Sequence, residues 1–215
     1  MSEIINANYF SPTENDNLLF DCNALMYIFY TFGAYTSDDI QVYKRIFTEA
    51  ISNHSNIFVS SIFLSEFSNT YIQNEYHRYM KNNYLRPSKF KFKKDYKPLE
   101  DYKETIQDVK NIIIKQILSV AKRIDDPFDK LNLNYFFDNE ASFDFNDRYY
   151  ALLAQYYNLK IVTNDADFLY ISDVDIITRN QAFFSIVKQN NFSTVIWTWI
   201  ISKQKPVPVG TGTGM

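Results

Sequence analysis

The sequence predicts an α/β protein with three layers, α/β/α, in which helices cover both faces of a mostly parallel sheet. Short apolar runs alternate with longer segments of helical periodicity, an order typical of parallel strands joined by crossover helices. Only four glycines occur among the 215 residues, which is few for an all-β fold with many tight turns. Because 46% of the residues are hydrophobic, one domain with a substantial core is expected over residues 1–205, followed by a flexible tail at 206–215.

The first third of the chain predicts two buried strands, each followed by helical segments. Residues 17–20 and 56–60 are short apolar runs of the kind found in parallel strands covered on both faces. Gly33 is a suitable C-terminal stop for the first helix, and Ser37 or Asp38 is the expected N-cap of the second. The helices are expected at residues 24–32, 37–52 and 61–80.

A basic and helical insertion into this domain is expected at about residues 81–135. Pro87 and Pro98 predict irregular structure over 81–100, within which the alternation of Lys and Phe over 89–93 predicts a short exposed strand. From Asp101 onward apolar residues recur at helical spacing, so a helix that packs against the core is predicted as far as residue 124. Its apolar stripe consists of Tyr102, Ile106, Val109, Ile113, Ile117, Val120 and Ile124.

The last third of the chain predicts a return to alternating helices and strands. A helix at about 144–157 precedes a strand at 160–163, and a further strand at 174–178 is followed by a short helix. Residues 194–201 are rich in β-branched and aromatic side chains, which favours a final strand.

The composition restricts the kind of metal site that the chain can build. Cys22 is the single cysteine, so an intrachain disulfide and a cysteine-ligated metal site are excluded. With only two histidines, His54 and His77, a multi-histidine zinc site is not expected either. Any metal would be a hard cation held mostly by carboxylates.

The N-terminal residues and the apolar runs predict neither an export signal nor a membrane segment. The first 16 residues lack a basic start and a continuous apolar core, and no apolar run reaches the roughly 18 residues needed to cross a bilayer. The cytoplasm is therefore the expected location, and no membrane partner is expected.

Four acidic residues occupy positions that a parallel sheet would bring to one edge. Asp21 directly follows one predicted strand and Asp165 stands just past the end of another, where ligands bind in open parallel sheets. Glu66 lies early in the helix after the second strand, and Asp147 in the first turns of a later helix. Carboxylates packed together repel one another unless a divalent cation neutralises them, and Mg²⁺ and Mn²⁺ prefer oxygen ligands. The sequence therefore predicts a catalytic Mg²⁺ or Mn²⁺ site at these acids.

Three segments resemble the motifs of PIN-domain nucleases, a family that includes the VapC-type bacterial toxins. The segment LLFDCNALMYIF resembles the opening strand and helix of the family, and SSIFLSEF resembles its second motif, with a glutamate on a helix. The segment NDRYYALLAQYYNLKIVTNDADF resembles the most recognisable stretch, an aspartate-led helix and a strand that ends in T-x-D-x-D-F. The matched segments span residues 18–168, with a longer middle insertion than the compact toxins have.

The resemblance implies a metal-dependent endoribonuclease that hydrolyses RNA phosphodiester bonds. It implies that Asn23 orients the first aspartate and that Thr163 buttresses the site. A toxin of a toxin–antitoxin pair is a narrower form of this interpretation and adds an antitoxin protein to the expected partners. Association into a homodimer is a separate expectation. The metal-binding acids of the family correspond here to Asp21, Glu66, Asp147 and Asp165, with Asp167 as a further, less constant ligand.

Each of the four acids also has an ordinary structural explanation. Asp21 could cap the following helix, and Asp165 could belong to a turn. Asp147 could be favoured at a helix start by the helix dipole, and Glu66 could be a solvated helix residue. The metal-site hypothesis is preferred, because otherwise four acids with unrelated structural causes would all have to occur in the order of the family motifs.

A basic segment gives this acidic protein a candidate RNA-binding surface. The formal net charge is −3, yet residues 78–97 hold eight basic residues and one acid. Ammonium groups can follow the phosphates of single-stranded RNA while aromatic rings stack on its bases. The alternative is a solvated loop whose rings pack into the core. The candidate RNA-binding residues are Arg78, Lys81, Arg86, Lys89, Lys91, Lys93 and Lys94, and the interleaved rings are Tyr79, Tyr84, Phe90, Phe92 and Tyr96.

The residues after the first strand also bear on other function classes. A haloacid-dehalogenase-like phosphatase needs a second aspartate two residues after the first, and Asn23 occupies that place. The glycine-rich phosphate loops of nucleotide-binding folds are absent from the sequence. A non-catalytic PIN-like RNA-binding or scaffold protein remains open, because a sequence does not show metal occupancy.

Overall fold

The fold was analysed in a computed structural model, which describes residues 3–33, 35–132, 134, 145–171 and 173–184. The described residues as far as Arg179 form one compact unit, and a second unit begins at Asn180. In the second unit, residues 181–184 are helical. The predicted strand at 194–201 and the predicted tail at 206–215 lie outside the described residues.

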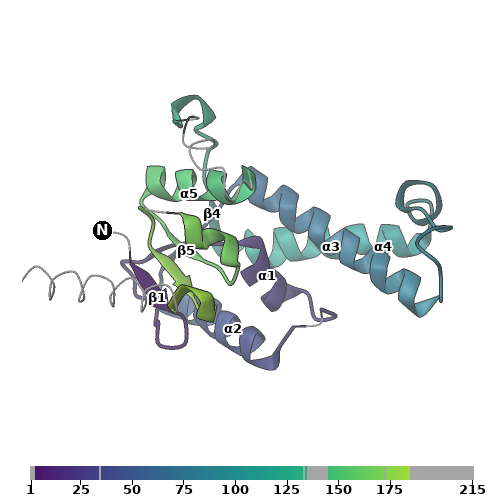
Figure 1. The fold of residues 1–215 in the computed structure, drawn as a ribbon, viewed down its shortest axis with the longest axis horizontal. Helices are drawn as coiled ribbons and strands as arrows, with labels where there is room; N and C mark the ends of the chain where they lie inside the picture. The colour runs from purple at the N-terminus through teal and green to yellow at the C-terminus, as the bar shows by residue number, and fades with distance from the viewer. Residues whose placement is uncertain (1–2, 34, 133, 135–144, 172, 185–215) are drawn as a thin grey trace, which may run out of the picture. The chain divides into compact units, whose positions relative to one another are not determined.

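Six parallel strands form the central sheet, in the order β1-β6-β5-β2-β3-β4. Helices lie on both sides of it, with α5 (Phe145–Tyr157) on one side and α1 (Cys22–Phe29) and α2 (Ser37–Ser52) on the other (Figure 1). This arrangement confirms the predicted three-layer α/β class. The strands predicted near 17–20, 56–60, 160–163 and 174–178 are all present, whereas β1 and β4 were not predicted. The strands are β1 (Ile4–Asn6), β2 (Asn17–Phe20), β3 (Asn56–Val59), β4 (Ala121–Arg123), β5 (Lys160–Val162) and β6 (Ile176–Thr178).

Strand β2 lies in the middle of the sheet and is buried on both faces. Leu18, Leu19 and Phe20 are almost fully excluded from solvent. Leu19 is in register with Phe58 of β3 on one side and with Ile161 of β5 on the other. The chain leaves β2 towards β3 in one direction and returns to β5 in the other, so the strand order reverses here. A ligand crevice is expected at the carboxyl ends of β2 and β5.

The helices of the first half begin where polar side chains can cap them. Asp21 accepts a hydrogen bond from the backbone N–H of Cys22 at the start of α1, and Ser60 caps α3. Thr36 caps α2 in place of the predicted Ser37 or Asp38, because its side chain accepts the N–H of Asp39. The helices are α1 (Cys22–Phe29), α2 (Ser37–Ser52) and α3 (Ser61–Asn82).

The predicted helix from Asp101 to residue 124 is wrong in its second half. Helix α4 (Glu100–Asn111) continues into the π-helical segment η2 (Ile112–Ile117), and the chain then forms β4. Ile112 is buried, while Ile106 and Val120 of the predicted stripe are exposed. The wider π-helical turns of η2 bring Ile117, five residues after Ile112, to the buried side. Residues 121–123 become a strand because they pair with the edge of β3.

The exposed strand predicted over Lys89–Lys93 is also wrong. A π-helical segment, η1 (Phe92–Tyr96), follows an irregular stretch there. Its aromatic rings turn inward, with Tyr96 fully buried and Phe92 packed against a cluster that contains Tyr76 and Met80 of α3. Burial of these rings outweighs the local alternation, because an isolated exposed strand would leave them in water.

Candidate functional site

Asp21 is held at the carboxyl end of β2 with almost no solvent exposure. Only 4% of its surface is accessible. Its Oδ1 accepts the backbone N–H of Cys22 at 2.6 Å, and its Oδ2 accepts the hydroxyl of Thr163 at 2.9 Å. Asp21 therefore caps α1, as the structural alternative to a metal ligand predicted. It also contacts Thr163, which follows the neighbouring strand β5.

Thr163 connects two of the predicted acids. Its fully buried hydroxyl donates to Asp21 and accepts the backbone N–H of Asp165 at 2.9 Å. A hydroxyl has one proton and two lone pairs, so both bonds can form at once. The predicted supporting residue thus lies between Asp21 and Asp165 at the edge where β2 and β5 end.

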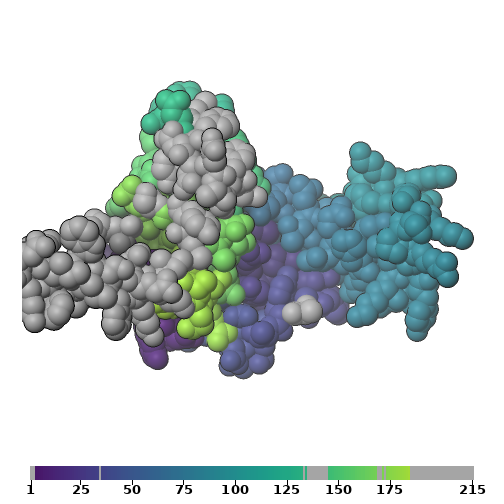
Figure 2. All heavy atoms as spheres, viewed as in Figure 1, coloured from purple at the N-terminus to yellow at the C-terminus, as the bar shows by residue number. Residues whose placement is uncertain are grey.

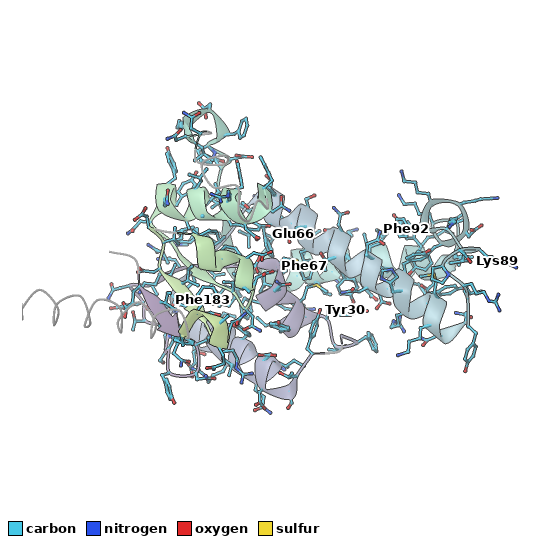
Figure 3. All side chains as sticks on the ribbon, in the orientation of Figure 1. Tyr30, Glu66, Phe67, Lys89, Phe92 and Phe183 are labelled. Carbon is cyan, nitrogen blue, oxygen red and sulfur yellow. The ribbon has the colours of Figure 1, made fainter. Side chains whose placement is uncertain are left out.

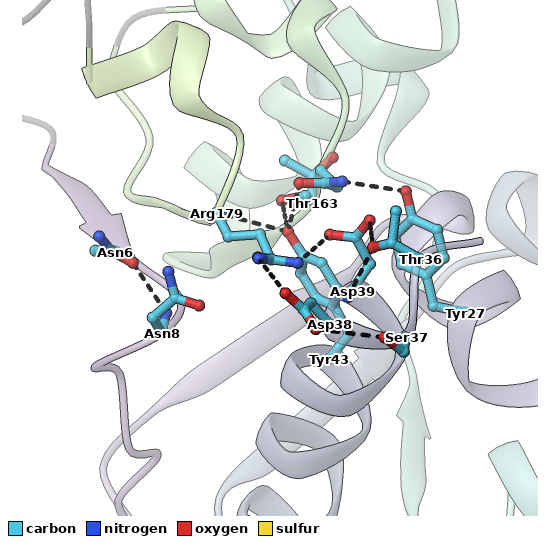
Figure 4. A network of polar contacts seen from close by, with 11 residues as sticks. Asn6, Asn8, Tyr27, Thr36, Ser37, Asp38, Asp39, Tyr43, Thr163 and Arg179 are labelled. Atoms are coloured by element: carbon cyan, nitrogen blue, oxygen red, sulfur yellow. Dashed lines mark hydrogen bonds and ion pairs between the residues drawn. The ribbon is translucent and has the colours of Figure 1, made fainter.

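Tyr43 of α2 holds the loop that follows β5 (Figure 4). Its hydroxyl lies 2.8 Å from the carbonyl of Thr163 and 3.0 Å from Oδ1 of Asn164, and it accepts the backbone N–H of Arg179 at 3.3 Å. Burial raises the pKa of this phenol, so it remains a neutral donor. The sequence offered no signal for this role, because a tyrosine on an amphipathic helix is expected to be a core residue.

Asp165 is positioned by Asn23 and by its own turn. The Asn23 amide donates to Oδ2 of Asp165 at 2.7 Å, and the backbone N–H of Asp167 donates to Oδ1 at 3.1 Å. The resemblance implied that Asn23 orients Asp21, but in the structure Asn23 contacts Asp165 instead. Asp167 is exposed.

Glu66 of α3 reaches the site from a third direction and contacts helix α5 (Phe145–Tyr157). The hydroxyl of Tyr150 donates to its Oε2 at 2.6 Å, and the Asn146 amide donates to the same oxygen at 3.3 Å. Burial and the neighbouring Glu66 both raise the pKa of Tyr150, which therefore stays protonated. Sequence reasoning missed both donors, although they lie close to the predicted Asp147 in the sequence. Asn146 directly precedes Asp147, and Tyr150 follows it by one helical turn.

The charges of the three acids are coupled. The pKa of Asp21 is raised to about 7, first by burial and then by the charge of Glu66, with a smaller contribution from Asp165. The hydrogen bonds from Thr163 and Cys22 act in the opposite direction but do not offset burial. Asp21, Glu66 and Asp165 therefore form one electrostatic unit, which we call the acid site.

The fourth predicted acid, Asp147, is half-buried in the first turn of α5 beside Asn146. Within the described ranges, no three or more His, Cys, Asp or Glu side chains are grouped closely enough to hold a metal ion. The chemistry of the acid site nevertheless fits a hard cation, because its donors are oxygens. A bound positive charge would also offset the free-energy cost of burying the Asp21 carboxylate beside other carboxylates, which raises its pKa.

The basic segment places its cations outward and most of its rings inward. Tyr79, Phe90, Phe92 and Tyr96 pack with Tyr76 and Met80, as in the alternative of a loop whose rings are buried. Tyr84, by contrast, is 93% exposed. The segment forms the surface at the end of α3 away from the sheet (Figures 2 and 3). Six of the seven candidate RNA-binding residues are exposed there, namely Lys81, Arg86, Lys89, Lys91, Lys93 and Lys94.

The seventh, Arg78, is half-buried and paired. Its Nε lies 3.0 and 2.9 Å from the two carboxylate oxygens of Glu75, and a terminal nitrogen contacts Glu75 as well.

A hollow of 510 Å³ lies at the amino-terminal edge of the sheet, opposite the edge that carries the acid site, near Asn17 and Lys160. None of the predicted site residues lines it, so it is not the candidate site. No helix in the described part of the chain is long and apolar enough to cross a membrane.

The chain is similar to a protein family and to a solved structure. The PIN domain family model matches residues 18–174, a range that contains all four predicted acids. A crystal structure of PAE2754 from Pyrobaculum aerophilum is 18% identical, covers 84% of this chain and 95% of its own, and has a TM-score of 0.43. No curated protein matches the chain.

Proposed function

Because this chain belongs to the PIN domain family, whose members are generally nucleases, we propose that it is an RNA-cleaving hydrolase that depends on Mg²⁺ or Mn²⁺. The observation that carries the proposal is the acid site. Burial, with the charges of the nearby Glu66 and Asp165, raises the pKa of Asp21 to about 7 at the edge where the strand order reverses. Such an arrangement is costly for folding alone, which points to a cationic ligand.

Asp21, Glu66 and Asp165 would hold the metal, and Asp147, in the first turn of α5, and Asp167 are further candidates. A divalent cation bound there supplies a water nucleophile of lowered pKa and neutralises charge on the phosphodiester and its leaving oxygen. The protein contributes by fixing its carboxylates. Hydrogen-bond donors that fix carboxylates in this way commonly orient metal ligands, and here they are Thr163 on Asp21, Asn23 on Asp165, and Tyr150 on Glu66.

The exposed cations at the end of α3 are proposed to bind the RNA backbone. Lys89, Lys93 and Lys94 are exposed, and the packed aromatic cluster beside them fixes the segment. Among the described residues, none of these three lysines forms an ion pair. Backbone binding of this kind is sequence-independent and weakens as salt is raised. Single-stranded or loop regions are the favoured substrate, because paired bases are inaccessible to the site.

The test is cleavage of structured and unstructured RNAs by the full chain in Mg²⁺, in Mn²⁺ and in EDTA. Asp21→Asn should abolish cleavage, while Asp129→Asn, an exposed aspartate on η3 (Phe128–Lys130), should leave it unchanged. Cleavage that persists in EDTA or in Asp21→Asn would contradict a metal-dependent nuclease. RNA binding without cleavage under any condition would favour the non-catalytic RNA-binding protein.

The narrower proposal, a toxin restrained by an antitoxin protein, is supported by the resemblance of the sequence motifs to those of toxins. Induced expression of the wild-type chain in a bacterial host should then arrest growth, and Asp21→Asn should not. A small reading frame that overlaps the start of the gene would be the candidate antitoxin, and its co-expression should restore growth. Normal growth during wild-type expression without that frame would contradict the toxin role.

A further inference from the structure

A hollow of 410 Å³ lies between the segment after α1 and the second half of α3. Its volume is in the range of pockets that hold one small ligand. It combines aromatic and basic side chains, whereas the acid site presents carboxylates. Its lining residues are Tyr30, Phe32, Gly33, Tyr35, Asn74, His77, Arg78, Lys81 and Asn82.

The hollow is connected to the acid site by two sets of residues. The ring of Tyr35 packs edge-on against Tyr27 at 4.7 Å between centroids, and the Tyr27 hydroxyl accepts the amide of Asn164, the residue before Asp165. Along α3, Asn74 follows Glu66 by eight residues, or about 12 Å of helix axis at about 1.5 Å per residue. His77 and Lys81 lie within about 60° of Glu66 around the helix, so they share its face.

Phe32 is the aromatic side chain that the hollow offers to a ligand. It is 64% exposed, although the guanidinium of Arg78 lies 4.6 Å from its ring centroid. Arg78 in turn is fixed by the carboxylate of Glu75, which is only 5% exposed. A buried acid therefore orients the arginine, the arginine and the edge-on ring of Tyr30 hold Phe32, and most of the Phe32 side chain faces solvent.

Lys81 and His77 complete the lining. Lys81 is exposed, and across the described ranges it forms no ion pair. His77 is also exposed, with its ring against Tyr76. A lysine and a histidine one helical turn apart can both reach an anionic group, and the buried Glu75 is already neutralised by Arg78.

We propose that this hollow binds one nucleotide of the single-stranded RNA substrate, with its base against Phe32 and its phosphate at Lys81. This inference rests on the proposed function. It identifies a position on the protein at which the RNA strand is bound near the site of cleavage. An exposed ring beside an unpaired lysine is the pairing that binds unstacked bases and their backbone. A protein partner would be favoured by a broader apolar surface, whereas this hollow is small and basic.

The test measures binding separately from cleavage. Fluorescence anisotropy of a labelled single-stranded RNA of about 12 nucleotides is followed with the full chain in EDTA. Phe32→Ala should weaken binding about tenfold, and Phe32→Tyr should restore it because it keeps the aromatic face. Lys81→Gln should lower the slope of log Kd against log salt by about 0.7, the value for one phosphate contact on a single strand.

Two matched controls lie outside the hollow. Tyr9→Ala removes another highly exposed ring, between β1 and β2, and Lys115→Gln another exposed lysine, on η2. Both should bind like wild type. If the chain cleaves RNA but Phe32→Ala and Lys81→Gln bind normally, the nucleotide site is wrong and a protein ligand becomes the occupant to test. If binding depends on Phe32 and Lys81 but no RNA is cleaved, the site stands and the proposed nuclease activity is wrong.

Discussion

The hydroxyl of Tyr150 donates a 2.6 Å hydrogen bond to Glu66 across 84 positions of the sequence. Tyr150 is buried on α5, and Glu66 projects from α3, so the bond joins two helices at the acid site. It also fixes Glu66, the acid whose assignment to the site rests mostly on sequence order and spacing. The carboxylate is thereby oriented before any ligand arrives.

Tyr150→Phe should reduce Mg²⁺ affinity, because Glu66 loses the donor that fixes it. Loss of a group that orients a metal ligand typically costs about 10- to 100-fold in metal affinity or activity. Cleavage measured as a function of Mg²⁺ concentration should shift to higher Mg²⁺ and recover at saturation. Tyr156→Phe, an exposed position on the same helix, is the control and should behave like wild type.

Thr163→Val should destabilise the metal-free protein more at pH 8 than at pH 5. The Thr163 hydrogen bond lowers the pKa of Asp21, so it favours the ionised acid, and its loss raises that pKa further. The expected cost at pH 8 is about 1–3 kcal/mol for an unsatisfied buried acceptor. Urea unfolding in EDTA at both pH values measures it. Thr163→Ser should retain wild-type stability at pH 8, and an equal loss for Thr163→Val at the two pH values would contradict this account.

The positions of Asp21 and Asp165 were predictable because they depend on local sequence. An apolar run followed by an acid identifies a strand and its carboxyl end, and parallel strands bring these ends to one edge. The contacts that complete the site were not predictable. The bonds of Tyr150 to Glu66 and of Tyr43 to Thr163 join residues 84 and 120 positions apart, and each tyrosine had a sufficient explanation as a core residue.

Two errors have a geometric cause. Asn23 was expected to orient Asp21, but residues two positions apart at a helix start point in different directions, and Asn23 faces Asp165 instead. The stripe that begins at Tyr102 was read with the α-helical period throughout. The π-helical turns of η2 shift its buried face, and pairing of residues 121–123 with β3 then ends the helix.

Arg78→Met should destabilise the protein by leaving the carboxylate of Glu75 buried without its cation. Removal of one partner of a fully buried pair costs about 3–5 kcal/mol. The Arg78 side chain is 36% exposed, so solvent screening reduces the expected loss to about 1–3 kcal/mol. Urea unfolding at pH 7 measures the change. The double variant Glu75→Gln with Arg78→Met should be more stable than Arg78→Met alone, and additive losses would show that the pair is not coupled.

The metal-free protein should lose stability as pH rises, because Asp21 has a higher pKa when folded than when unfolded. The folded value is about 7 and the ordinary value is 3.8, so the folded state binds the proton more tightly between these limits. The stabilising contribution of the protonated acid is therefore complete below about pH 4 and is lost as pH rises through about 7. For one proton, the slope cannot exceed about 1.4 kcal/mol per pH unit.

Asp21→Asn should remove this dependence, since the amide is neutral at every pH. In EDTA, the variant should be more stable than wild type at pH 8 and close to wild type at pH 4, as measured by urea unfolding. Asp129→Asn should keep the wild-type slope. Excess Mg²⁺ should stabilise the wild type at pH 8 and have little effect on Asp21→Asn, because a ligand stabilises the state that binds it. A wild-type stability that is flat from pH 4 to 8 would show that Asp21 is ionised without penalty, and the electrostatic argument for a cation site would then fail.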